Sequence, residues 1–174
     1  MTNIFILLGG IWSFDGPVTS SGMYMLRSML SKLPNVSIKT YLWASWTQCY
    51  NDVMAAKDEK VAIIGFSGGA MKETWVANGC VLGAHGIIYL KRPNIDLLVA
   101  YDPSPAGSVQ LLGKNVKRAV CYYNAAPWMF GLGGGRLGGD TEIQTITIRE
   151  QHLAVQTDMA LHRRTVAEVA RLQP

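Results

Sequence analysis

A serine framed by glycines, between a predicted strand and a predicted helix, constrains the fold of this chain more than any other feature. Val61 to Ile64 is a short apolar run rich in β-branched residues, which indicates a buried strand. Gly65-Phe66-Ser67-Gly68-Gly69 follows it, and Ala70 to Ala77 is predicted to be a helix. A chain that turns sharply at Ser67 needs neighbours without a Cβ, because strand and helix approach closely. The sequence therefore predicts a strained strand–turn–helix unit with Ser67 at its apex.

Strand, G-x-S-x-G and helix in this order are typical of a nucleophile elbow, and on these residues the chain resembles the α/β-hydrolase family. The resemblance implies that a carboxylate and a histidine follow the serine, each just beyond a strand end. Asp102 directly follows the strand predicted for Ile95 to Tyr101. His152 lies four residues past the strand predicted for Ile143 to Ile148. The resemblance spans nearly the whole chain, from about residue 3 to residue 172.

The candidate base is a histidine, because a serine hydroxyl is a weak nucleophile at neutral pH and needs a proton acceptor beside it. Of the three histidines, His152 has the family's position in the loop after the final predicted strand. His85 comes too early in the chain order, and His162 lies within the last predicted helix. We therefore expect His152 to take the proton of Ser67.

The candidate acid is Asp102, whose carboxylate is expected to orient the imidazole and stabilise its charged form. The family more often places its acid one strand later, where this chain has Asn124, which carries no charge. Asp140, further along a glycine-rich stretch, is the rival acid. Asp102 is followed by proline, and Asp-Pro is also common turn chemistry, so the assignment stays open between the two aspartates.

Backbone N–H groups are the expected donors to the oxyanion that develops during acyl transfer. The resemblance implies one donor from Gly68, the residue after the nucleophile. The second is expected from Gly10 or Ile11, in the loop after the first predicted strand. The chain has Leu8 where the family commonly has a histidine before this glycine turn, which leaves the choice between Gly10 and Ile11 open.

Two tryptophans, Trp12 and Trp128, lie in predicted loops on the expected active-site side and are candidates to line an acyl pocket. Trp128 belongs to the irregular stretch Ala125 to Asp140, which is either a flap over the substrate or a surface turn beside a core tryptophan. The same stretch contains G-x-G-x-x-G from Gly133 to Gly138. A dinucleotide-binding loop should follow a strand directly and open a helix, and this one does neither, so we discount it.

The fold class predicted from the alternation of strands and helices is α/β, with helices on both faces of a mostly parallel sheet. The predicted strands are Ile4 to Leu8, Val36 to Trp43, Val61 to Ile64, Ile95 to Tyr101, Val116 to Tyr123 and Ile143 to Ile148. We expect a three-layer α/β/α sandwich with about six strands, a minimal α/β-hydrolase fold similar to small esterases of the cutinase or thioesterase kind. No repeat or linker is found, so residues 1–174 are expected to form a single domain.

Composition limits the partners of this chain. The 174 residues are 49% hydrophobic and 16% charged, which excludes a disordered chain, and the net charge is only +4. The basic residues are scattered, a pattern typical of a solvated surface, so no nucleic-acid partner is expected. The three cysteines, Cys49, Cys80 and Cys121, form neither a disulfide framework nor a zinc pattern. The apolar run from Ile4 to Leu8 is too short for a signal peptide or a membrane span, which favours a cytoplasmic protein.

The function predicted from these residues is a serine hydrolase that cleaves a carboxylic ester or thioester through an acyl-enzyme, with Ser67, Asp102 and His152 as its triad. We expect a small-molecule or lipid-like ester as substrate and no metal or organic cofactor. The alternative is a hydrolase-like fold without catalysis that serves as a binding or structural module. The reduced sheet, the missing histidine before Gly9 and the position of Asp102 favour this alternative.

Overall fold

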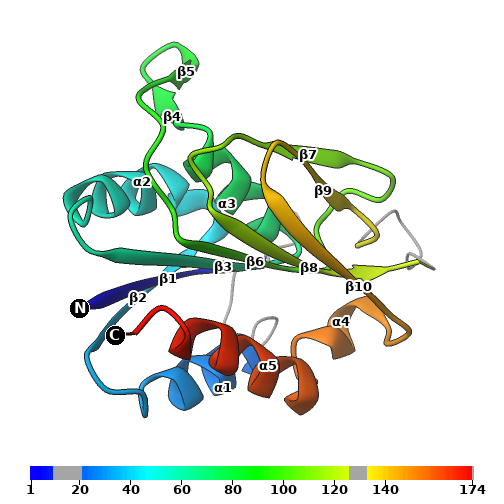
Figure 1. Cartoon of the computed structure of the whole chain (residues 1–174). Coiled ribbons are helices and arrows are strands. Elements are labelled where there is room, and N and C mark those ends of the chain that lie inside the picture. Colours follow the sequence, from blue (N-terminus) through cyan, green and yellow to red (C-terminus); the bar gives the residue numbers. More distant parts are fainter. Residues whose placement is uncertain (10–20, 126–132, 174) are drawn as a thin grey trace.

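A six-stranded sheet forms the middle layer of the fold (Figure 1). The structure is a computed structural model that describes residues 1–9, 21–125 and 133–173. The strands of the sheet are β1 (Thr2–Leu8), β2 (Val36–Leu42), β3 (Lys60–Phe66), β6 (Leu97–Tyr101), β8 (Arg118–Asn124) and β10 (Glu142–Ile148). Their order is β10-β8-β6-β3-β1-β2, and every neighbouring pair is parallel. The predicted parallel sheet of about six strands is confirmed.

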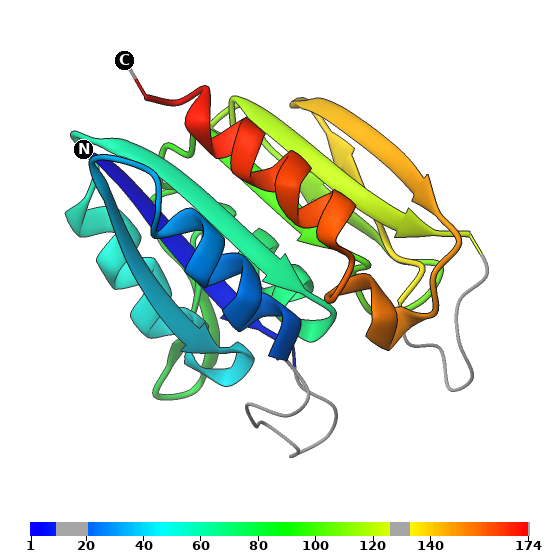
Figure 2. The ribbon, with the colours of Figure 1, turned by 90° about the horizontal axis from the view of Figure 1, so that it is seen from below.

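Helices cover both faces of this sheet, as Figures 1 and 2 show. On one face lie α2 (Trp46–Ala55), which follows the short 3-10 turn η1 (Trp43–Ser45), and α3 (Gly68–Ala77). On the other lie α1 (Ser21–Leu30), α4 (His152–Val155) and α5 (Met159–Ala170). The predicted three-layer α/β/α arrangement is therefore confirmed. In the part of the chain that the structure describes, no helix is long and apolar enough to cross a membrane.

Four short strands were not predicted from the sequence. Strands β4 (Cys80–Gly83) and β5 (Gly86–Tyr89) form an antiparallel hairpin, and β7 (Val109–Leu112) pairs in parallel with β9 (Arg136–Gly139). The stretch Ala125 to Asp140 is therefore not irregular throughout, since its C-terminal part contains β9. The prediction of one last helix around His162 is also wrong, since the chain there forms α4 and α5. Asp158 caps the start of α5 by accepting the N–H groups of Ala160 and Leu161.

The central strands are buried on both faces, which explains their continuous apolar sequences. In β1, Ile4 and Ile6 pack into the core beneath α1 and α5, whereas Phe5 and Leu7 pack into the core beneath α2 and α3. Side chains alternate between the two faces of a strand, so an uninterrupted apolar run supplies both cores at once. This double burial fixes the sheet between the helical layers and places the strand ends that carry the candidate site.

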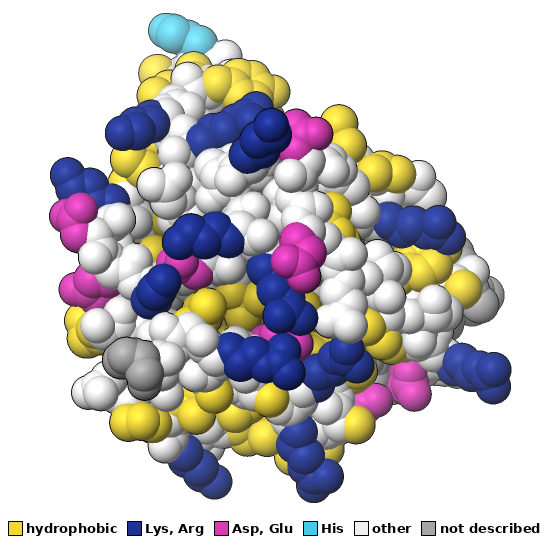
Figure 3. All heavy atoms as spheres, in the orientation of Figure 1, with side chains coloured by type: hydrophobic (Ala, Val, Ile, Leu, Met, Phe, Trp, Pro, Cys, Tyr) yellow, Lys and Arg dark blue, Asp and Glu magenta, His cyan; other side chains and the backbone are white. Residues whose placement is uncertain are grey.

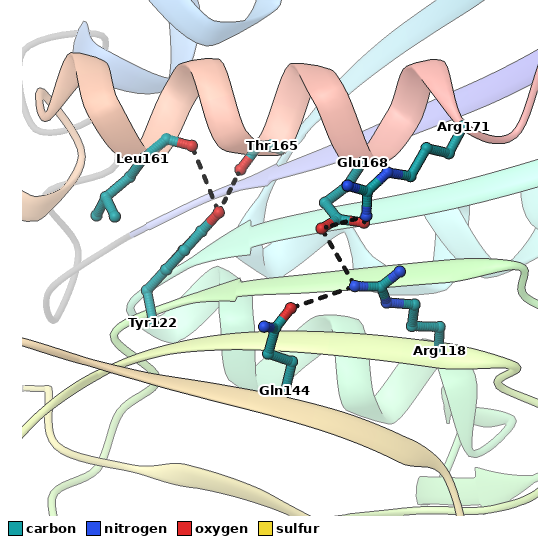
Figure 4. A network of polar contacts seen from close by, with 7 residues as sticks. All are labelled: Arg118, Tyr122, Gln144, Leu161, Thr165, Glu168 and Arg171. Carbon is teal, nitrogen blue, oxygen red and sulfur yellow. Dashed lines mark hydrogen bonds and ion pairs between the residues drawn. The ribbon is translucent and has the colours of Figure 1, made fainter.

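Polar contacts attach α5 to the edge of the sheet near β8 (Figure 4). The Glu168 carboxylate pairs with Arg118 of β8 at 3.2 Å and with Arg171 at 3.0 Å. One turn earlier, the hydroxyl oxygens of Tyr122 and Thr165 lie 3.2 Å apart. Because α4 immediately precedes α5 in the chain, these contacts also restrain the segment that begins with His152.

One acid lies between α3 and the sheet without a partner. The Glu73 side chain is fully buried, and neither of its carboxyl oxygens has a hydrogen-bond partner among the described residues. A Cβ on Gly65 of β3 would lie 2.7 Å from Glu73 Oε2, so the carboxyl group packs directly against the strand that leads to Ser67. Burial raises the pKa of Glu73 well above its ordinary value, because a charged carboxylate loses its hydration there. Burial therefore favours the protonated, uncharged form of Glu73 in the folded protein.

This protonation makes stability fall as pH rises. The unfolded chain releases the Glu73 proton near the ordinary carboxyl pKa of 4.5, whereas the folded protein keeps it to higher pH. The part of the stability that depends on Glu73 protonation is therefore fully present below pH 4.5. It decreases as pH rises toward the pKa of Glu73 in the folded protein. We expect Glu73→Gln, which cannot ionise, to gain stability over the wild type by about 1.4 kcal/mol for each pH unit in that window.

Denaturant unfolding of both proteins at pH 5 and pH 8 measures this effect. Glu142→Gln, a change at an exposed glutamate, is the matched control and should show no such trend. A stability difference between Glu73→Gln and the wild type that is the same at both pH values would contradict the protonated state.

Candidate active site

The turn between β3 and α3 holds Ser67 in a strained backbone conformation, with φ of 55° and ψ of −119°. The two glycines of G-x-S-x-G permit this turn. A Cβ on Gly65 would lie 2.6 Å from the Ala70 Cα, and a Cβ on Gly69 would lie 2.3 Å from the carbonyl oxygen of Leu7. Neither position accepts a side chain, so the predicted close approach of strand and helix at Ser67 is what the structure has.

The structure brings Ser67, His152 and Asp102 into one hydrogen-bonded chain. Ser67 Oγ lies 2.8 Å from His152 Nε2, and His152 Nδ1 lies 2.7 Å from Asp102 Oδ2. The three residues are 2%, 0% and 0% exposed, in chain order Ser67, Asp102, His152. A carboxylate only accepts hydrogen bonds, so Nδ1 carries a proton and donates it, and Nε2 accepts from the Ser67 hydroxyl. The sequence predicts that His152 lies in a loop, but it is the first residue of α4.

The Asp102 carboxylate is held by backbone donors on the side away from the histidine. Asp102 Oδ1 accepts the N–H of Gly134 at 2.7 Å and the N–H of Asn124 at 3.2 Å. These bonds replace the hydration that the carboxylate loses when it is buried. Asn124, at the end of β8, thus contributes a backbone donor to the carboxylate that follows β6. Asp140, the rival acid, is exposed at the end of β9, with its N–H bonded to the Leu112 carbonyl.

Gly133 covers the pair formed by Asp102 and His152. A Cβ on Gly133 would lie 2.1 Å from Asp102 Oδ2 and 2.6 Å from His152 Nδ1, and its φ is +71°. Both the space and the backbone conformation therefore require glycine at this position. From the sequence, the glycines of this stretch are predicted to belong to a flap or a surface turn and not to a nucleotide-binding loop, so the cover over Asp102 and His152 was not predicted. The signal was the glycine content itself, which indicates a close approach of backbone to other groups.

Ser104 and Phe66 complete the surroundings of the nucleophile and were not predicted. Ser104 Oγ accepts the N–H of Gly133 at 2.9 Å and lies 3.3 Å from Ser67 Oγ. Because a lone pair of Ser104 Oγ accepts the Gly133 N–H, the Ser104 O–H can donate a hydrogen bond to Ser67 Oγ. The Phe66 ring stacks on the His152 imidazole with centroids 5.1 Å apart, which fixes the ring plane and excludes water from it.

The remaining predicted residues divide into one that the structure places and several that it does not. Gly68 is the first residue of α3, directly after Ser67, where backbone N–H groups have no partner within the helix. The other predicted residues, Gly10, Ile11, Trp12 and Trp128, lie outside the described residues.

The three cysteines are buried free thiols. Burial raises the pKa of Cys121 to about 12 and raises that of Cys49 as well, so both are protonated at neutral pH. Among residues 1–9, 21–125 and 133–173, no group of three His, Cys, Asp or Glu side chains is placed to hold a metal ion.

Solved structures include chains that are similar in fold to this one. A Listeria innocua gene product is 11% identical with a TM-score of 0.52, over 93% of this chain and 91% of that chain. Thermogutta terrifontis esterase 2, phosphoramylated by tabun, is 10% identical with a TM-score of 0.52, over 98% of this chain and 81% of that chain. Human thioesterase 2 is 8% identical with a TM-score of 0.50, over 99% and 98% of the two chains.

Comparisons of sequence gave no relatives: no protein-family model matches the chain, and no curated protein does. The likeness to solved structures therefore defines the fold and nothing finer. Together with the strand order of the sheet, it shows that this chain has the α/β-hydrolase fold.

The tight cover over the histidine–aspartate pair can be tested without reference to activity. Gly107, with φ of +72° and nothing within 4 Å of an added Cβ, is a matched control for Gly133. We expect Gly107→Ala to lose about 1 kcal/mol of stability, because a Cβ disfavours this backbone region. Gly133→Ala should lose a further 1–3 kcal/mol or so, because Asp102 and His152 must also move. Denaturant unfolding measures both, and equal losses would show that Gly133 does not press on the pair.

Proposed function

We propose that this protein is a serine hydrolase that cleaves a carboxylic ester or thioester through an acyl-enzyme. The observation that carries the proposal is the hydrogen-bonded chain from Ser67 Oγ through His152 to Asp102, at 2.8 Å and 2.7 Å. The strained backbone at Ser67 supports it, because strain of this kind persists mainly where a reaction needs it. The similar fold of an esterase and of a thioesterase supports the choice of ester and thioester as substrates.

In the first half of the reaction, Ser67 Oγ attacks the substrate carbonyl carbon while His152 Nε2 takes its proton. The charged imidazolium is stabilised by Asp102, 2.7 Å from Nδ1, which also keeps the ring in the required tautomer. The tetrahedral intermediate then collapses. His152 returns the proton to the departing alcohol or thiol, and the acyl group stays on Ser67.

The oxyanion of this intermediate needs donors that are in place before the reaction. Gly68 N–H is one proposed donor, because it opens α3 and the positive end of that helix favours negative charge. Gly10 or Ile11 remains the proposed second donor. The Ser104 hydroxyl lies 3.3 Å from Ser67 Oγ, close enough to donate a hydrogen bond to that oxygen as its charge changes during the reaction.

In the second half, water replaces the alcohol or thiol. His152 takes a proton from the water as its oxygen attacks the acyl carbon, and then gives that proton to Ser67 Oγ as the acyl–oxygen bond breaks. The products are a carboxylic acid and the free serine. The steps exchange only protons and the acyl group, so the proposal invokes no metal or organic cofactor.

The nucleophile can be tested with a covalent probe. A fluorophosphonate probe should label the native protein at Ser67, and Ser67→Ala should remain unlabelled because it has no hydroxyl to react. Ser108→Ala, a change at a nearby serine with no contact to the triad, should label like the wild type. Mass spectrometry of the labelled peptide measures this, and absence of label on well-folded native protein would contradict the proposal.

Hydrolysis of short p-nitrophenyl esters distinguishes the enzyme from the alternative, a binding or structural module. His152→Ala should lower the rate by several orders of magnitude, because Ser67 then has no base. His85→Ala, at an exposed histidine in the turn between β4 and β5, serves as the control and should keep the wild-type rate on these soluble esters. Equal background rates in the wild type and His152→Ala would favour the module.

The acid can be tested separately. Asp102→Asn should lower kcat by about 10⁴-fold, as the corresponding change does in other triads, because the imidazole loses its tautomer and its counter-charge. Asp140→Asn should stay within a few-fold of the wild type, since Asp140 is exposed at the end of β9. If Asp140→Asn proves the more damaging change, the assignment of Asp102 is wrong.

A further inference from the structure

The β4–β5 hairpin carries large apolar side chains into solvent. It projects from the layer formed by α2 and α3 (Figure 1). Five apolar residues in the hairpin and just after it are between 46% and 77% exposed: Leu82, Ile87, Ile88, Tyr89 and Leu90. Successive side chains of a strand point to opposite faces, so Ile87 and Ile88 expose apolar surface on both sides of the hairpin.

The root of the hairpin is fixed, so this exposure is not that of a loose loop. Three side chains of α2 bond to its backbone. The bonds are Trp46 Nε1 to the Cys80 carbonyl at 3.2 Å, the Leu82 N–H to Thr47 Oγ1 at 2.9 Å, and the Tyr50 hydroxyl to the Lys91 carbonyl at 2.8 Å. Helix α2 therefore presents the apolar residues in a defined orientation.

Strand β7 carries two more exposed apolar residues. Val109 and Leu111 are 57% and 64% exposed. Asn78 Nδ2 donates to the Leu111 carbonyl of β7 at 2.7 Å. The Leu90 N–H, just after the hairpin, donates to the carbonyl of Gly79, the residue after Asn78, at 2.8 Å. Residues 78 and 79 thus connect β7 with the base of the hairpin. We call the seven residues the apolar face: Leu82, Ile87, Ile88, Tyr89, Leu90, Val109 and Leu111. They are seven of the thirteen exposed large hydrophobic residues in the described part of the chain, so the exposure is concentrated here.

The charged residues of the segment that carries the apolar face are mostly basic. Between Thr74 and Gly139 the sequence contains only two acids, Asp96 and Asp102. Asp102 is fully buried, and Asp96 is paired with Lys60 at 3.3 Å and with Lys117 at 2.7 Å. Exposed basic residues follow the hairpin and flank β7 and β9: Lys91, Arg92, Lys114 and Arg136. Figure 3 shows apolar side chains gathered over the hairpin, with Lys, Arg and acidic side chains beneath them. Asp140, directly after β9, is an exposed acid.

We propose that the apolar face docks the protein onto an anionic lipid surface. Apolar side chains gain free energy when they leave water, and each nearby Lys or Arg adds attraction to a negatively charged leaflet. Apolar groups on both faces of one projecting hairpin suit a fluid phase that surrounds it, whereas a flat protein partner would cover only one face. The two acids among residues 74 to 139 are a buried one, Asp102, and one paired with lysines, Asp96. This segment therefore presents little negative charge to repel an anionic surface.

Co-sedimentation with vesicles tests this proposal on the whole chain. Vesicles of phosphatidylcholine with 30% phosphatidylglycerol, a roughly physiological share of anionic lipid, should retain the wild type, and raised salt should release it. The double change Ile87→Ser with Ile88→Ser should weaken binding about tenfold or more, because it removes apolar area from the hairpin. Lys91→Glu with Lys114→Glu should weaken it by at least about tenfold and reduce the salt effect.

The matched control is Tyr24→Ser with Met25→Ser, two adjacent and similarly exposed apolar residues on α1, beyond the opposite face of the sheet. This control should bind like the wild type, and circular dichroism melting should show that every variant is folded. Failure of the wild type to bind, or equal loss in the control, would overturn the proposal. Equal binding to pure phosphatidylcholine would overturn the anionic assignment. A wild-type dimer that the Ile87/Ile88 change converts to monomer would assign the face to a second copy instead. Hydrolysis of soluble p-nitrophenyl esters is measured in parallel, and it should be unchanged in all these variants.

Discussion

The buried charge of Asp102 is the constraint on which the arrangement of the site depends. A carboxylate that is fully removed from water is tolerated only when donors replace its hydration. Its donors come from three separate parts of the chain: the end of β8 through Asn124, the segment before β9 through Gly134, and α4 through His152. Folding must bring all three to the end of β6 at once, so the same bonds that orient the histidine also join distant segments.

Backbone strain is concentrated at the same place. Among the described residues, the non-glycine residues with positive φ are Asn35, Ser67 and Asp102, so two of the three are proposed catalytic groups. A conformation of this kind costs about 1–3 kcal/mol and persists only when its surroundings hold it. At Ser67 the surroundings are the tight contacts of Gly65 and Gly69, and at Asp102 they are the backbone donors to its carboxylate.

The sheet and the three proposed catalytic residues could be predicted, because both leave local signals in the sequence. Buried parallel strands such as β1 and β3 are uninterrupted apolar runs, and Ser67, Asp102 and His152 follow strand ends in a fixed order. The glycine content signals a close backbone approach near Gly133, but its partner could not be predicted, since Asp102 is 31 residues away in the chain. The hairpin was missed because Ile87 to Leu90 is apolar without being buried, and apolar runs are ordinarily assigned to cores.

The bond from Trp46 to the hairpin has a mechanical consequence. The same indole lies against the Lys72 ammonium, which is 3.9 Å from the centre of its ring, and Lys72 belongs to α3, the helix that begins directly after Ser67. One aromatic ring thus serves two partners, the backbone of the hairpin and a cation on the nucleophile helix. The ring cannot rotate without giving up one of them. A displacement of the hairpin root therefore strains a contact of the helix behind Ser67 as well as its own bond to Trp46.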